Sequence, residues 1–393
     1  MLGGAANTAE ADRPLVRDLP ERASLIAERS LTDTESVQRA QSQDLRPTGE
    51  AERETARASS SASWRTALAP YARPHLGRAV LDLATSVLPY LALCAGIYFA
   101  LRVSVLLALA LAIPTAGFLV RIFILFHDCT HGSFLASRRA NTWLGTVLGL
   151  LLWSPFMRWR HDHAVHHATS GDLERRGIGD VRTLTIGEYN ALSARERLGY
   201  RLLRNPLVMF GLGPIVAMII GPRIVSRNAR PRMRRSVIAT DLALAALVAA
   251  LCWLLGWSAY LLVFGPAALM AGSAGIWLFY IQHQFDEAYW KPSGEWDYAH
   301  AALRGSSYLK LPPLLRFFTG NIGLHHVHHL NARIPNYNLQ RAHDANPDLF
   351  SGVPTLSLRD GVRAVRLKLW DEERERLVSF AAARRAIRRP SAA

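Results

Sequence analysis

The stretch that decides the fold is residues 242–282, LALAALVAALCWLLGWSAYLLVFGPAALMAGSAGIWLFYIQ. These 41 consecutive residues include no Asp, Glu, Lys, Arg or His. One bilayer crossing takes about 20 apolar residues in a helix, whereas an apolar run in a soluble core helix seldom passes about 14. The stretch is therefore long enough for two crossings, and it excludes a soluble globular protein.

Two more apolar runs precede this stretch. Residues 83–101 carry no charge, and residues 103–126 carry only Arg121. Together with the long run, they predict an all-α integral membrane fold with four transmembrane helices. The expected spans are residues 79–101, 103–126, 236–257 and 259–282.

Two uncharged stretches are ambiguous, residues 141–157 and 205–222. The second contains three prolines and three glycines, which favour an interfacial or broken helix over a straight span. We expect interfacial helices in both places, with a cytoplasmic helical cap formed by the polar residues after 283.

The polar ends of the chain are predicted to lie outside the membrane domain. Residues 1–66 carry 11 acidic and 9 basic residues and a run of Ala and Ser at 58–63, so we expect a disordered cytoplasmic tail over 1–68. A membrane domain over 69–345 and a basic cytoplasmic segment over 346–393 follow. The polar N-terminus lacks the apolar core of a cleaved signal peptide, and Cys94, Cys129 and Cys252 lack the spacing of a disulfide framework.

The net charge of +15 is carried outside the N-terminal tail, and only three of the 46 basic residues are lysines. Basic loops beside anionic lipid account for such a charge, and no motif supports nucleic-acid binding. The positive-inside rule places both termini and the 127–235 loop in the cytoplasm. This orientation is predicted from six arginines shortly before the third span: Arg223, Arg227, Arg230, Arg232, Arg234 and Arg235.

Histidines carry the chemical signal, because 11 of the 14 fall in four places. Residues three or four apart share one face of a helix. This spacing groups eight imidazoles, and a ninth, His283, stands alone where the fourth span ends. The full set is His127, His131, His163, His166, His167, His283, His325, His328 and His329. The same spacing turns His161 and His326 away from these faces, so we expect them to be surface or supporting groups.

Four crossings bring the four places together on one side of the membrane. If residues 141–157 crossed alone, the second cluster would lie opposite the first, so we expect that stretch to be shallow. Neutral imidazole binds Zn, Fe, Cu or Ni. Nine imidazoles exceed the ligand number of one ion, and two metals with four or five ligands each account for them. No carboxylate repeats at the Glu-x-x-His spacing of soluble di-iron bundles.

The pattern resembles the membrane-bound fatty acid desaturase family, with its His-x3-His, His-x2-His-His and His-x2-His-His boxes. The likeness covers residues 120–345 and is strongest to bacterial acyl-lipid desaturases at 166–172 and 328–337. It implies that the nine histidines hold two iron ions and that the enzyme uses O₂ to remove two hydrogens from an acyl chain. The relatives that look most similar suggest that this acyl chain belongs to a phospholipid. His283 corresponds to the single extra ligand that the family has between its second and third boxes. Thr130 stands where the family often has a smaller residue.

Other roles are predicted around this centre. Asp128, Asp162, Asp172 and Asp180 could orient imidazole N–H groups. The chain has neither a haem-binding His-Pro-Gly-Gly element nor a cysteine array, so we expect an external electron donor such as ferredoxin or flavodoxin. Two alternatives stay open: a hydroxylase, epoxidase or ketolase on the same scaffold, and a histidine-rich metal transporter. A transporter places its ligands mid-membrane within spans, unlike these clusters.

Overall fold

The computed structural model describes residues 63–177, 179–225 and 229–388. Within them, four helices are long and apolar enough to cross a membrane. They are α3 (Leu76–Ala100), α4 (Val105–His131), α9 (Pro231–Leu255) and α10 (Trp257–His283). The four predicted spans and the all-α membrane fold are confirmed, although α4 continues five residues beyond the predicted end of its span.

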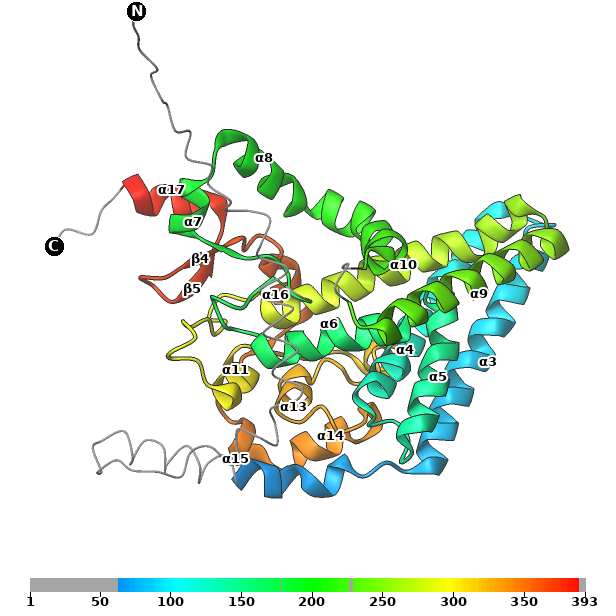
Figure 1. The fold of residues 1–393 in the computed structure, drawn as a ribbon, viewed down its shortest axis with the longest axis horizontal. Helices are drawn as coiled ribbons and strands as arrows, with labels where there is room; N and C mark the ends of the chain where they lie inside the picture. The colour runs from blue at the N-terminus through cyan, green and yellow to red at the C-terminus, as the bar shows by residue number, and fades with distance from the viewer. Residues whose placement is uncertain (1–62, 178, 226–228, 389–393) are drawn as a thin grey trace, which may run out of the picture. The chain divides into compact units, whose positions relative to one another are not determined.

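Helix α4 lies at the centre of this bundle, packed against α3, α10 and the shorter helix α5 (Arg138–Leu151) (Figure 1). Just over half of its most apolar window is buried (56%), compared with 28% or less for the other three helices. The other three therefore turn most of their apolar side chains outward, as in a bundle surrounded by lipid.

One charged residue is buried within the bundle. Arg121 of α4 donates to the Asp82 carboxylate (2.6 Å) and the Ser86 hydroxyl (3.0 Å), both on α3, and to the Phe317 carbonyl oxygen. Its guanidinium also stacks over the Phe317 ring. A buried charge is tolerated when it is paired and fully hydrogen-bonded, and this network ties the second span to the first.

The two ambiguous stretches do not form straight spans. Residues 141–157 divide between α5 and α6 (Phe156–Thr169), with a break at 152–155. Each of these helices has 14 residues and is about 21 Å long, which is shorter than the hydrocarbon core of about 30 Å. Neither helix is therefore long enough to cross alone, and the shallow position of this stretch stays a prediction.

Residues 205–222 are broken, as predicted. After α8 (Ala194–Leu203), the chain bends by 60° into two π-helical segments, η2 (Val208–Leu212) and η3 (Ile215–Ile220), and a 3₁₀ turn, η4 (Gly221–Arg223). The broken segment lies against α10, where a side chain at Gly272 would approach Pro214 to 2.7 Å. Glycine at this position therefore permits the close approach.

Short helices and strands cover the end of the bundle where α4 and α10 finish (Figure 1). The helices are η1 (Ala69–Ala72), α7 (Ile186–Ala191), α11 (Tyr298–Arg304), α12 (Pro313–Phe318), α13 (His325–Leu330), α14 (Asn336–Asp344), α15 (Pro347–Phe350), α16 (Leu358–Ala364) and α17 (Phe380–Arg388). They form the predicted helical cap.

The cap also contains five short strands that the sequence does not predict. Strand β1 (Leu184–Thr185) pairs in parallel with β4 (Leu369–Asp371), which pairs antiparallel with β5 (Arg376–Val378). Strand β2 (Tyr308–Leu309) pairs in parallel with β3 (Thr355–Leu356). Residues after 345 are therefore joined by strand pairing to the 184–309 region, while the predicted domain boundary at 345 stays a prediction.

The predicted tail over 1–68 lies outside the described residues except for its last six. Residues 63–68 are helical, and Trp64 and Leu68 are buried in a cluster with Leu324, Val327 and Leu330. For these six residues the prediction of disorder is wrong, because two large apolar side chains within them bury against the cap.

Candidate metal centre

Four helices deliver the nine predicted histidines to one region. His127 and His131 occupy the last turn of α4, which ends at Gly132 in the left-handed conformation. His163, His166 and His167 lie on α6, and His283 is the last residue of α10. The remaining three, His325, His328 and His329, belong to α13. All nine rings belong to two compact groups.

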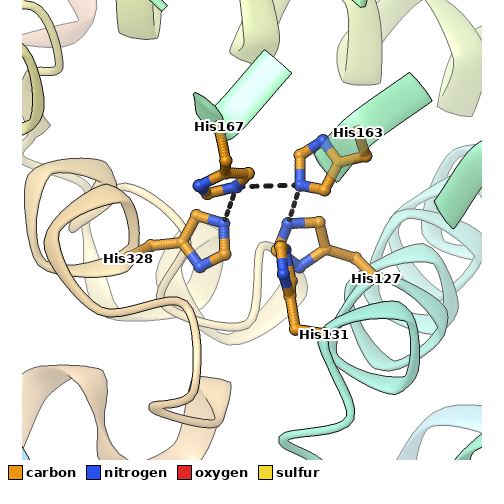
Figure 2. Close-up of side chains that lie close together, drawn as sticks. All are labelled: His127, His131, His163, His167 and His328. Atoms are coloured by element: carbon orange, nitrogen blue, oxygen red, sulfur yellow. Dashed lines mark hydrogen bonds between the residues drawn. The ribbon is translucent and has the colours of Figure 1, made fainter. Parts of the chain in front are cut away.

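The first group combines α4, α6 and α13 (Figure 2). Its members are His127, His131, His163, His167 and His328, with one ring nitrogen of each within 4.8 Å of all the others. The Nε2 atom of His163 lies 2.9 Å from that of His127 and 3.1 Å from that of His167. The His167 Nε2 atom is in turn 2.9 Å from the Nε2 atom of His328.

The second group combines α6, α10 and α13. Its members are His166, His283, His325 and His329, all buried, and again one nitrogen of each lies within 4.8 Å of the others. The His166 Nε2 atom is 3.2 Å from the Nε2 atoms of both His283 and His329, and the His325 and His283 Nε2 atoms are 2.9 Å apart. The adjacent residues His166 and His167 thus belong to different groups.

The donor atoms fit two metal ions. Nitrogens bound at about 2.0–2.1 Å around one ion lie roughly 3–3.5 Å from one another, which is the separation found within each group. The buried Nε2 atom of His131 has no hydrogen-bond partner. In a buried site, nitrogen lone pairs that point toward one another are costly unless a cation binds them, and so is a ring nitrogen without a hydrogen-bond partner. Each group could therefore hold one metal ion.

Five imidazoles of the two groups that lie outside the membrane spans are held neutral. Burial, followed by the charges of neighbouring imidazoles, holds the pKa of His163, His167, His325, His328 and His329 well below the ordinary value. Neutral imidazole is the form that binds a metal ion, because protonation would occupy the donor lone pair.

Outer partners orient three of the rings. The Nδ1 atom of His127 lies 3.3 Å from the Asp128 carboxylate, and that of His166 contacts Asp180. The Nδ1 atom of His283 lies 3.0 Å from the Gly305 carbonyl oxygen. An acceptor at Nδ1 fixes the proton there and leaves the Nε2 lone pair for a metal. Two of the four aspartates expected in this role therefore occupy it.

The other two aspartates do not contact the rings of the two groups. Asp162 pairs with Arg158 at 2.7 Å, one helical turn earlier. Asp172 accepts from the Arg175 guanidinium and the Ser293 hydroxyl, and therefore ties two loops together. For both residues the prediction is wrong, because arginines nearby in the chain or a loop hydroxyl satisfy the carboxylate.

Several supporting residues were not predicted from the sequence. Asn336 donates from its backbone and side-chain nitrogens to the Asp128 carboxylate, at 2.7 and 3.0 Å. Trp159 stacks on His163 with ring centroids 4.3 Å apart. Gly305 acts only through its carbonyl oxygen. Asn336 and Trp159 stand beside the histidine motifs, but no spacing rule links them to a ring.

The two histidines predicted to be apart from the nine are apart from them. Neither His161 nor His326 belongs to a metal group. The His326 Nε2 atom lies 3.1 Å from the Nδ1 atom of His343, and its ring packs on Phe350. His326 is fully buried rather than exposed, so it supports the cap from the far side of α13.

A mainly apolar cavity of about 310 Å³ begins at the histidines and extends between the spans. His127, His163 and His325 lie on its wall at one end. Along α10 the wall runs from Gln282 back to Ala271, a distance of about 16 Å along the helix axis. The cavity could hold an extended apolar chain beside both groups.

Replacing single histidines tests the assignment of the two groups. Purified protein should contain two metal ions per chain, measured by elemental analysis. His163→Ala and His325→Ala should each lose at least one ion, because each removes a converging nitrogen. His161→Ala and His326→Ala should retain both, although His326→Ala should unfold at a lower temperature. Equal metal loss in all four variants would contradict the assignment.

Comparison with known proteins identifies the family. Residues 102–355 match the family model for fatty acid desaturases. The chain is similar to a fatty acid desaturase of Bacillus subtilis (strain 168), with 46% identity over 80% of this chain and 89% of the relative. It is also 28% identical to a Synechocystis sn-1 acyl-lipid omega-3 desaturase (ferredoxin), over 57% of this chain and 63% of that relative. A chloroplastic omega-6 fatty acid desaturase of Brassica napus is 28% identical over 57% of this chain and 50% of the relative. This chain is therefore an enzyme of the fatty acid desaturase family.

Proposed function

We propose that the protein introduces a double bond into a fatty acyl chain, using O₂ and two iron ions held by the nine histidines. The observation that carries the proposal is the pair of all-imidazole groups at the end of an apolar cavity in a member of this family. Iron bound there would supply the oxidising power to remove hydrogen from an unactivated carbon.

The protein's own residues provide position and a dry environment. The last turns of α4 and α10 hold His127 and His283 at the end of the bundle, and α6 and α13 bring the other rings against them. The cavity wall includes Leu119, Phe123 and Phe279, which exclude water and confine the chain to an extended path. The acyl carbons beside His127, His163 and His325 are the ones that would react.

The substrate is an acyl chain in the membrane, and we infer that it belongs to a phospholipid. The cavity follows α4 and α10 into the apolar part of the bundle, at the depth where acyl chains lie in a bilayer. The name of the Synechocystis relative specifies an acyl-lipid substrate and supports this inference.

The reaction also needs an external electron donor. Reducing O₂ to two waters takes four electrons, of which the acyl chain supplies two as its two C–H bonds break. An iron–sulfur cluster takes about four cysteines, and the chain has three, all free. A ferredoxin, named for the Synechocystis relative, or a flavodoxin would supply the other two electrons.

Product analysis tests the proposed reaction. Expression in a host that lacks desaturases should give new monounsaturated acyl chains in the membrane phospholipids, located by mass spectrometry. The His163→Ala variant, expressed to the same level, should give none. An oxygenated product in place of an alkene would instead support the hydroxylase alternative.

The cavity predicts a position where added volume should block the acyl chain. Gly275 lines the cavity, and a Cβ placed there meets nothing within 4 Å. Gly275→Phe would therefore add a ring at the cavity wall with no clash at its Cβ, and it should lower desaturation of long acyl chains at least about tenfold. Metal content should be unchanged.

Gly265 provides the matched control for this variant. It lies on the same helix, also has nothing within 4 Å of an added Cβ, and is exposed outside the cavity. Gly265→Phe should keep normal turnover. Equal turnover of Gly275→Phe and the native protein would contradict the placement of the chain.

We further propose that the protein lies in the inner membrane with the histidine groups on the cytoplasmic side. The side of the membrane on which a residue lies can be measured with single cysteines, introduced one at a time into a variant that lacks the three native cysteines. Cysteines replacing the exposed residues Arg195, Glu287 and Arg333 should react with an impermeant reagent only from the cytoplasmic side. A cysteine replacing Ser258, at the far end of α10, should react only from the outside. Labelling of position 195 from the outside would contradict this topology.

A further inference from the structure

Three exposed arginines lie on three neighbouring helices near the first histidine group. Arg138 is the first residue of α5, Arg160 lies in the second turn of α6, and Arg232 lies in the first turn of α9. These helices pack against one another in all three pairs. The charge of Arg160 interacts with the other two, because Arg232 and Arg138, after the larger effect of partial burial, lower the pKa of Arg160.

No described acidic side chain lies within ion-pair distance of any of the three guanidinium groups. Several other arginines around the cap are paired, for example Arg175 with Asp172 and Arg376 with Asp286. Helices α5 and α9 also begin here, and the N-terminus of a helix carries a partial positive charge. An anion would offset the repulsion between neighbouring positive charges, and all three side chains are exposed and can reach one.

The depth of the cluster indicates which anion is available. On α5, Trp143 and Val147 follow Arg138 by about one and two to three turns and are 73% and 57% exposed, as expected for side chains in contact with lipid. On α9, the apolar span begins within about two turns of Arg232. The cluster therefore lies where lipid headgroups lie, and the anion of that layer is phosphate.

The cluster is also close to the metal centre. At about 100° per residue, Arg160 lies on the same face of α6 as His163 and His167, three and seven residues later. Three residues correspond to a rise of about 4.5 Å. The charge of Arg160 is near enough to the His131 ring to interact with it.

We propose that Arg138, Arg160 and Arg232 bind the phosphate of the phospholipid whose acyl chain enters the cavity. That this lipid is the substrate rests on the proposed function, whereas the binding itself does not. Arginine is suited to this role, because its planar group donates two parallel hydrogen bonds to phosphate oxygens. The site would hold the headgroup beside His163 while the acyl chain lies along α10.

A binding measurement tests the site separately from turnover. The probe is radiolabelled dioleoyl phosphatidylglycerol, titrated onto the metal-loaded protein in dodecyl maltoside micelles at low salt. The variant Arg138→Gln/Arg160→Gln/Arg232→Gln should bind it at least about tenfold more weakly, because each lost charge-assisted bond contributes to the affinity. The matched control replaces three exposed arginines of the cap, Arg333, Arg341 and Arg366, with Gln and should bind like the native protein.

Other ligands in the same binding assay show which part of the lipid the site recognises. Dioleoylglycerol, which has the same acyl chains and no phosphate, should bind the native protein and the triple variant equally weakly. Inorganic phosphate should compete only at millimolar concentration, because it lacks the chains; equal competition at micromolar concentration would show a free-phosphate site and overturn the proposal. Arg138→Gln/Arg232→Gln, on helices that carry none of the nine histidines, should weaken binding even if the triple variant loses metal.

Unchanged phosphatidylglycerol binding by both variants would overturn the proposal. So would unchanged lipid binding combined with loss of binding to an acidic ferredoxin, which would make the cluster a protein docking surface. If the native protein binds the lipid through the arginines but forms no double bond in the desaturase-free host, the proposed function fails while the lipid site stands.

Discussion

The structure depends on keeping nine imidazoles together in a buried site without leaving their nitrogen lone pairs unbound. Within each group the nitrogens approach to about 3 Å, and such an arrangement is stable only around a cation. The four crossings meet the geometric part of this requirement. Helices α4 and α10 end at His131 and His283, so the chain leaves the membrane at the point where ligands are needed. Helices α6 and α13 then need only pack across these two ends.

The surrounding polar network serves the same constraint. Asp128 contacts the His127 ring and is itself held by two hydrogen bonds from Asn336, at the start of α14. Asp180 and the Gly305 carbonyl oxygen orient one ring each in the second group. Each oriented ring presents its Nε2 atom inward, so the cap contributes to ligand geometry as well as covering the site. The apolar cavity and the arginine cluster lie on the membrane side of this network, where a lipid would approach.

Much of this arrangement could be predicted from the sequence, because membrane spans and helical histidine faces are local patterns. The four spans were predicted within five residues at each end. Eight of the nine histidines were selected by their spacing, and His283 by its place at the end of the fourth span. The division into two groups could not be predicted. It separates the adjacent residues His166 and His167, and it depends on which rings of α4, α10 and α13 each side of α6 meets. The roles of Asp162 and Asp172 were mispredicted for a similar reason, since their partners depend on side-chain conformation and loop contacts. The strands β1 to β5 have only two or three residues each and leave no periodic signal.

The central claim is that the two groups hold two iron ions with histidine ligands alone. Anomalous X-ray diffraction at the iron absorption edge, from crystals of the native protein, tests it most directly. The account predicts two iron peaks, one enclosed by His127, His131, His163, His167 and His328 and the other by His166, His283, His325 and His329. A single peak, or two peaks that appear at the zinc edge and not at the iron edge, would contradict it.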